Sequence, residues 1–313
     1  MRPDKILEFI FFGNYFYAFC AAALSVEASL QQNVPLNTPA YYCLLISGTI
    51  VYYTYAYLGQ MRFGTVKTKE TIHPYYNKRT QWYKDNYSLV SIMQLFFILI
   101  MIVSALYLSI IEFHEIFTLR WDEWVALLIV PLVAILYYGN DYFSFIKINI
   151  RKSGIAKPFL IGFVWAAAVS VYPVMFYKWQ INRHYQITFL SIWFFVKNWM
   201  FISMLCIMFD IKDYADDSNK KLKTFVVRVG LRKTIFYILL PLTLIGLLSL
   251  WAFGSIMHFS FEKILINTIP FVCLLIVAYS MQRRRPILYY LIIIDGLMLV
   301  KAFCGIAAAI IVK

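Results

Sequence analysis

Long apolar runs dominate this chain and restrict what it can fold into. As a helix, about 20 apolar residues cross the hydrocarbon core of a bilayer, roughly 30 Å thick. Backbone groups in lipid must be hydrogen-bonded within the structure, so each such run is expected to be helical. Nine runs of this kind lie at residues 9–27, 40–60, 89–111, 124–145, 158–177, 187–209, 234–254, 261–281 and 287–312. The sequence therefore predicts an all-α integral membrane protein with nine transmembrane helices.

The composition supports this class. Hydrophobic residues make up 62% of the 313 residues and charged residues 14%, whereas soluble domains are about 25% charged. The five cysteines all lie in apolar runs and form no CxxC pair, which indicates buried thiols rather than a metal or disulfide site. No linker rich in Gly or Ser interrupts the chain, so we expect one transmembrane domain over residues 1–313.

The net charge of +13 is unevenly distributed. Most Lys and Arg residues lie in the N-terminal segment and in alternate connections, the longest of which are near residues 61–88, 146–157 and 210–233. Basic loops stay cytoplasmic. We therefore predict a cytoplasmic N-terminus and a C-terminus on the opposite side. The positive charge is therefore explained by the orientation of the protein in the membrane. Membrane lipid is the predicted partner, and no nucleic acid is predicted.

The densest acidic cluster follows the sixth apolar run, in FDIKDYADDSNKKLKTFVVRVG at residues 209–230. On a helix that continues this run, Asp210, Asp213 and Asp217 point within about 60° of one another, with Asp216 at the edge. Carboxylates at a helix C-terminus are unfavourable without a cation, and Mg²⁺ is held by one or two carboxylates plus phosphates. We predict that the three aspartates bind Mg²⁺. The alternative is a solvated turn whose acids pair with nearby lysines.

Basic residues directly after the cluster suit the diphosphate that such a metal would hold. Lysine acts on phosphate as a point charge and arginine as a fork of donors. The predicted contacts in this segment are Lys220, Lys221, Lys223 and Arg228.

This arrangement of acids, polar turn and KTFVVRVG resembles the second aspartate motif of the UbiA-type intramembrane prenyltransferases. Thr224 and Gly230 match that motif, while Phe225 and Val226 replace its usual Leu-Pro. KPFLIGFVWA at residues 157–166 resembles the opening of the family's fifth helix. The resemblance implies a nine-helix UbiA-like bundle. It also implies Mg²⁺-dependent transfer of a prenyl group from an allylic polyprenyl diphosphate to a small hydrophobic acceptor, aromatic or a quinone precursor. On this resemblance Asp210, Asp213 and Asp217 are catalytic residues.

The first aspartate motif of that family, NDxxDxxxD, is missing. It is expected at the end of the second apolar run, where the chain has no aspartate before Asp85. One explanation is a single-metal enzyme in which basic groups of this loop, Arg79 included, hold the diphosphate. The predicted contacts there are Arg62, Lys67 and Lys69. The other explanation is a non-catalytic relative that binds an isoprenoid lipid or a partner protein.

Charged residues inside the apolar runs are the last notable feature. Lys197, Asp295 and Lys301 lie within predicted spans, where a charge costs about 2.5–3.5 kcal/mol on insertion scales. We expect a buried Lys197–Asp295 pair and a Lys301 side chain that extends toward the membrane surface. Lys197 and Asp295 give a transporter its only support as a further alternative.

Overall fold

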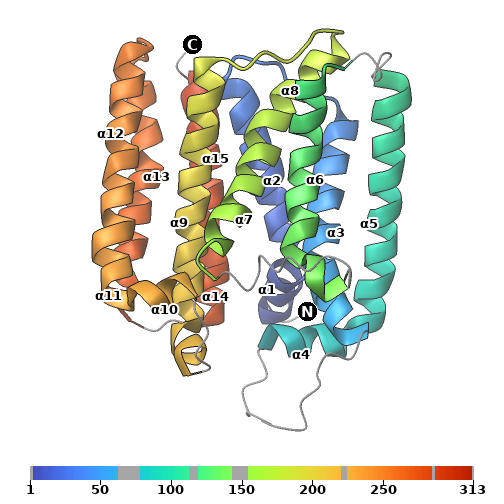
Figure 1. The fold of residues 1–313 in the computed structure, drawn as a ribbon, viewed down its shortest axis with the longest axis vertical. Helices are drawn as coiled ribbons and strands as arrows, with labels where there is room; N and C mark the ends of the chain where they lie inside the picture. Colours follow the sequence, from blue (N-terminus) through green and yellow to red (C-terminus); the bar gives the residue numbers. More distant parts are fainter. Residues whose placement is uncertain are drawn as a thin grey trace. The chain divides into compact units, whose positions relative to one another are not determined.

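A computed structural model describes residues 3–62, 78–112, 119–142, 154–219, 224–283 and 286–311. In these ranges the ordered elements are helices, and none is a strand. The predicted all-α class is confirmed for this part of the chain (Figure 1).

The chain divides into two compact units. Unit 1 comprises Met1–Ala22 and Asn37–His114, and unit 2 comprises Ala23–Leu36 and Glu115–Lys313. The division falls inside one helix, α2 (Tyr15–Gln31). A single transmembrane domain over the whole chain stays a prediction.

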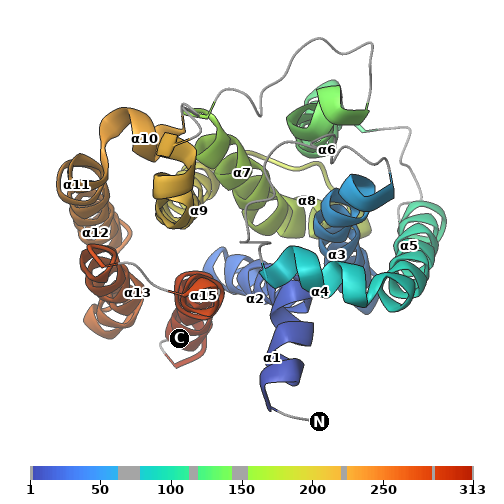
Figure 2. The ribbon, with the colours of Figure 1, turned by 90° about the horizontal axis from the view of Figure 1, so that it is seen from below.

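Unit 1 is built around two long helices that pack along each other, α3 (Pro39–Arg62) and α5 (Tyr87–Tyr107). A π-helical turn, η1 (Leu108–Glu112), continues α5. The short helix α4 (Lys78–Asp85) runs across the ends of α1 (Pro3–Phe12) and α3 (Figure 2).

Unit 1 also contains a sharp helix break, where α1 and α2 meet at 59°. Asn14 lies at the break in the left-handed conformation (φ 67°). From α4, Arg79 donates to the Asn14 side chain and to the Phe12 carbonyl. The Tyr83 hydroxyl also donates to that carbonyl, at 2.8 Å. Burial raises the pKa of Tyr83 to about 12, partly offset by the nearby charge of Arg79. The α4 side chains thus satisfy polar groups that the broken helix leaves without partners.

Unit 2 contains the remaining helices. In chain order they are α6 (Trp121–Tyr142), α7 (Lys157–Ala166), η4 (Ala167–Val171), α8 (Tyr172–Gln180), α9 (Phe189–Asn219), α10 (Phe225–Val229), α11 (Leu231–Lys233), η5 (Thr234–Leu239), α12 (Leu240–Ile256), α13 (Phe261–Ser280), α14 (Ile287–Tyr289), η6 (Tyr290–Ile294) and α15 (Gly296–Ile311). α7 packs along α9, and α13 packs against both α12 and α15. The α7–α9 crossing is close at Gly162, where a Cβ would collide with Ser203.

Six helical segments are long and apolar enough to cross a membrane, or seven if the bent pair of α1 and α2 is one span. The six are Tyr87–Ile110, Lys157–Gln180, Phe189–Tyr214, Leu231–Ile256, Phe261–Ser280 and Ile287–Ile311. Helices α3 and α6 also lie at predicted positions, but tyrosines dilute the hydropathy of α3, and the last side chains of α6 lie outside the described part of the structure. The chain therefore has the long apolar helices of a multi-pass membrane protein, while nine spans and the orientation of the termini stay predictions.

The surface of α5 fits a lipid environment. Its side chains Ile92, Leu95 and Leu99 are 64%, 67% and 60% exposed. Lipid is as apolar as these side chains, so such a face needs no protein cover in a bilayer.

Candidate functional site: the polar end of α9

The acidic cluster lies on the last turns of α9, a helix of 31 residues. The apolar run of this helix ends at Phe209, and the helix continues to Asn219. The prediction that a helix carries Asp210, Asp213 and Asp217 beyond the apolar run is therefore confirmed.

Asp210 forms an ion pair with the first residue of α7. Lys157 Nζ donates to Asp210 Oδ1 at 2.8 Å. The Asp210 side chain is 8% exposed and that of Lys157 is 33% exposed. The second carboxylate oxygen, Oδ2, is buried without a hydrogen-bond partner among the described residues. An orphan buried carboxylate oxygen is costly, so this half of Asp210 has an unused capacity for a donor or a cation.

Asp213 is in a more open position. Its partner is the adjacent Lys212, with Nζ 3.0 Å from Oδ1, and the Asp213 side chain is 48% exposed. This contact matches the alternative in which the acids pair with nearby lysines. Exposed pairs of this kind contribute about 0–1 kcal/mol.

The chain after α9 returns to the same place. Phe225 N–H donates to the carbonyl of Gly154, just before α7, at 3.2 Å. The Phe225 ring packs edge-on against Phe159 with centroids 5.9 Å apart. Thr224 precedes α10, and its hydroxyl is buried without a hydrogen-bond partner among the described residues. We call Lys157, Asp210, Asp213 and Thr224 the α9 corner.

Other predicted contacts are placed only in part. Arg228 lies on α10 and is exposed. The backbones of Arg62 and Asp217 lie on α3 and α9, but their side chains are outside the described part of the structure. The remaining predicted diphosphate contacts fall outside the described residues: Lys67, Lys69, Lys220, Lys221 and Lys223.

Arg79 corrects one part of the sequence interpretation. It was expected to face a diphosphate, but it is 6% exposed and donates to Asn14 and Phe12 across the helix break. Its guanidinium also lies 4.5 Å from the centre of the Tyr57 ring. Burial and these contacts give Arg79 a structural role in unit 1.

The described residues do not test a resident Mg²⁺, because the side chain of the predicted ligand Asp217 lies outside them. Within this part of the chain, no three His, Cys, Asp or Glu side chains are grouped as a metal site. Lys157 already occupies one oxygen of Asp210, and an ammonium competes with a metal for the same carboxylate. Magnesium coordination therefore stays a prediction that rests on the sequence motif.

A second polar centre lies within the membrane-spanning part of unit 2. Lys301 on α15 donates to both oxygens of Glu27 on α2, at 2.9 and 2.6 Å. Its side chain is 6% exposed, so Lys301 does not extend to the surface as predicted. Nor does Lys197 pair with Asp295, since its ammonium lies over the rings of Trp193 and Phe194. The sequence analysis did not identify Glu27 as the partner of Lys301. The available signal was the position of this acid in an apolar run.

A third centre holds the start of α6. The Glu123 carboxylate is 1% exposed by side chain and accepts from Trp179 Nε1 at 3.0 Å and Tyr185 N–H at 2.6 Å. His184 Nδ1 lies 2.9 Å from its other oxygen. Burial alone would raise the pKa of Glu123, but these hydrogen bonds and one from the Arg120 N–H lower it to about 2. Glu123 thus fastens the connection between α8 and α9 to α6.

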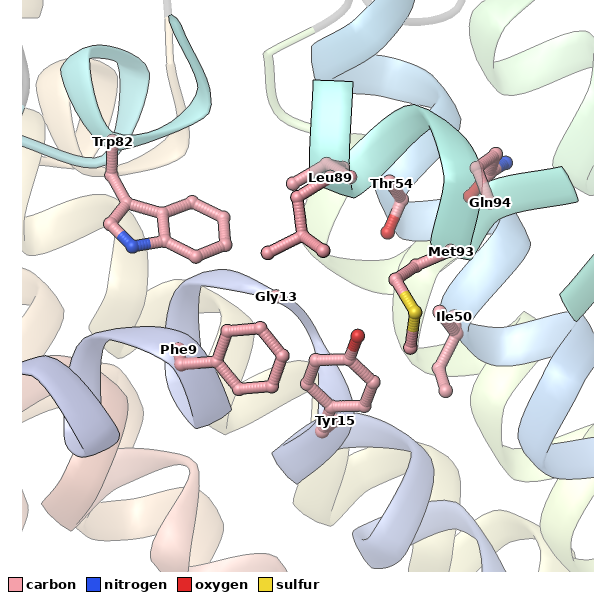
Figure 3. A pocket seen from close by; sticks show the side chains of 10 residues that line it. Phe9, Gly13, Tyr15, Ile50, Thr54, Trp82, Leu89, Met93 and Gln94 are labelled. Carbon is pink, nitrogen blue, oxygen red and sulfur yellow. The ribbon is translucent and has the colours of Figure 1, made fainter. Parts of the chain in front are cut away.

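Unit 1 contains a small pocket of about 10 Å³, which is room for about one water molecule. Figure 3 shows the rings of Phe9, Tyr15 and Trp82 at this pocket, together with Met93. The buried side-chain amide oxygen of Gln94, Oε1, has no hydrogen-bond partner among the described residues. A single water would suit this oxygen, whereas an isoprenoid tail would not fit the space.

Comparison of the chain with protein-family models, with curated proteins and with solved structures finds no match.

Proposed function

We propose that this protein binds an allylic polyprenyl diphosphate at the α9 corner and transfers the prenyl group to a small aromatic or quinone-precursor acceptor in the membrane. The observation that supports this most is Asp210, a buried carboxylate at the end of a membrane helix with one oxygen on Lys157 and the other without a partner. Such an arrangement suits a polar ligand at the boundary between lipid and water.

Lys157 is the group best placed to contact the diphosphate. An ammonium has three donors, and its bond to Asp210 uses one of them. Asp210 orients the amine, and the partial exposure of Lys157 leaves its other donors accessible. The Thr224 hydroxyl, also without a partner, is a further donor held beside the start of α7 by the Phe225–Gly154 hydrogen bond.

The proposed step is cleavage of the bond between the allylic carbon and the diphosphate oxygen. The electron pair goes to the oxygen, and Lys157 stabilises the negative charge that develops there. The acceptor forms a bond to the allylic carbon and loses a proton to water. Mg²⁺ bound by the aspartate motif would offset the charge of the unpartnered Asp210 oxygen, which otherwise repels the diphosphate.

A non-catalytic isoprenoid-binding role is the second candidate. The Lys157–Asp210 pair favours it, because a carboxylate neutralised by lysine is a weaker metal ligand. In this role the same corner would bind the diphosphate without breaking it.

Diphosphate release separates the two candidates. The full-length protein in nanodiscs would be supplied with allylic diphosphates of increasing length and with aromatic acceptors, in Mg²⁺ and in EDTA. We expect release that depends on protein and falls about ten- to a hundredfold in Lys157→Gln, because one charged hydrogen bond contributes about 1.5–3 kcal/mol. Saturable donor binding without release would support the non-catalytic role.

The matched control is Lys78→Gln, which removes an exposed lysine paired with Glu8. We expect this variant to bind and release as the wild type does. If no allylic diphosphate binds to the wild type, both candidates are wrong. If Lys157→Gln and Lys78→Gln behave alike, the α9 corner is not the diphosphate site.

A further inference from the structure

Two neighbouring helices of unit 2 end beside each other in an exposed group of cations and tyrosines. α11, η5 and α12 form one helical segment, Leu231–Ile256, and α13 returns along it after a short turn. α13 packs against α12 and also contacts η5. The start of the first segment and the end of α13 therefore lie side by side at one end of unit 2 (Figures 1 and 2).

Five residues form this group, which we call the α11–α13 patch. Arg232 and Lys233 are exposed on α11. Arg283 is exposed in the turn that follows α13. Two tyrosines accompany these cations, with Tyr237 76% exposed on η5 and Tyr279 62% exposed on α13. Both helices thus present a cation and an exposed phenol at the same end.

The tyrosines of the two helices lie at matching depths. Tyr237 is 19 residues before the last residue of α12, and Tyr279 is 18 residues after the first residue of α13. At about 1.5 Å per residue, both lie roughly 27–28 Å from the turn that joins these helices. The hydrocarbon core of a bilayer is about 30 Å thick, so the phenols lie at the interface, where tyrosine is enriched. Lys233 and Arg283 are each four residues farther from that turn, at the level of lipid phosphates.

The patch is positive and its own helices supply no acid to balance it. Within residues 224–283 the one acid is Glu262, in the first turn of α13 at the opposite end. On α9, Asp213 has Lys212 as its partner, and Asp295 is buried. In the described part of the chain the three cations form no ion pair. Cations in the first turn of a helix also add to the positive end of its dipole.

We propose that the α11–α13 patch binds the headgroup of an anionic phospholipid. The cations attract the phosphate, and the phenol hydroxyls donate to phosphate or ester oxygens beside it. Leu244 and Leu248, 49% and 68% exposed, follow Tyr237 at seven and eleven positions and so share its face of the helix. The acyl chains would lie along this face. A water-soluble anion would use the cations alone, whereas a phospholipid matches the cations, the phenols and the leucines in the order in which they occur.

This proposal does not rest on the proposed function. None of the five residues belongs to the α9 corner or to the predicted diphosphate contacts, and no prenyl donor enters the test. The charge distribution predicts that this end of unit 2 is cytoplasmic, and the cytoplasmic leaflet is the one that carries a negative surface potential.

The test is lipid binding to the purified full-length protein in detergent micelles, measured by native mass spectrometry. Phosphatidylglycerol and phosphatidylcholine with the same acyl chains differ in net charge alone. We expect the wild type to bind phosphatidylglycerol about tenfold or more tightly, since each surface cation contributes roughly fivefold. The triple variant Arg232→Gln, Lys233→Gln and Arg283→Gln should lose most of this preference. Tyr237→Phe should weaken phosphatidylglycerol binding about two- to tenfold, because one hydrogen bond is lost.

The matched control removes three exposed cations from other parts of the surface, in the triple variant Lys5→Gln, Lys78→Gln and Arg183→Gln. It has the same net charge as the patch variant and should keep the preference of the wild type. Equal affinity of the wild type for the two lipids would overturn the proposal, as would equal losses in the two triple variants. Excess glycerol 3-phosphate should leave the lipid bound, and displacement would assign the patch to a soluble phosphate instead.

Discussion

The two buried lysine–carboxylate pairs of unit 2 differ in how completely they are satisfied. In the Glu27–Lys301 pair both carboxylate oxygens are bonded and the two side chains are 0% and 6% exposed. In the Asp210–Lys157 pair one oxygen is bonded, the other has no described partner, and the lysine is 33% exposed. The first pair is closed and the second retains capacity for a ligand. The comparison indicates that a buried charge signals function through what its partners leave unsatisfied, rather than through burial alone.

The largest effect should come from breaking the closed pair. Lys301→Met leaves Glu27 buried without its partner, which should cost about 3–5 kcal/mol of unfolding free energy. The double variant Glu27→Leu with Lys301→Met should recover most of this loss, because no lone charge remains. Unfolding in SDS–detergent mixtures would measure both. A loss under about 1 kcal/mol in the single variant would mean that the pair is not closed.

Glu123 is a third buried carboxylate, and unlike the other two it is held mainly by neutral N–H donors. The pKa of Glu123 is lowered from 4.5 to about 2. Its contribution is therefore fully present above pH 4.5 and should be lost as the pH falls from about 4.5 to about 2. The loss should be about 3 kcal/mol. Acid titration of stability in the wild type and in Glu123→Gln isolates this effect, and parallel curves would contradict it.

The open pair should contribute less to stability than either of these. Lys157→Met removes one ion-pair hydrogen bond, but because the lysine it replaces is one-third exposed, water can take the place of the ammonium beside the Asp210 carboxylate. We expect a loss of about 1–2 kcal/mol in the same unfolding assay. A loss as large as that of Lys301→Met would show that the α9 corner is a structural pair and would weaken its assignment as a ligand site.

The smallest change in stability is expected from single-cysteine variants that report on which side of the membrane each centre lies. The charge distribution predicts that the α9 corner is cytoplasmic and that the Glu123 centre is on the opposite face. Exposed positions near each are Arg232 and Arg183. In a cysteine-free background, Arg183→Cys should react with an impermeant maleimide in intact cells and Arg232→Cys should not, with stability unchanged. The reverse pattern would invert the topology.

The class of this protein follows from the sequence by itself. Hydropathy and helical periodicity are local properties, and lipid leaves the backbone little alternative to a helix. The helical extension that carries Asp210 to Asp217 was predicted by continuing the apolar helix and reading the spacing of its acids. The six apolar segments overlap predicted ranges, whereas the tyrosines of α3 keep its hydropathy too low for composition to decide whether it spans.

The pairing of the charges was decided by the tertiary structure. Lys157 and Asp210 are 53 positions apart, and Glu27 and Lys301 are 274 apart. No periodicity links such positions, and several partners were equally plausible from composition. Arg79 shows the same limit, because its role depends on a helix break at Asn14 that brings α4 across it. Which charges are closed and which remain open to a ligand is set by how the helices pack, since packing brings side chains from distant parts of the chain into contact.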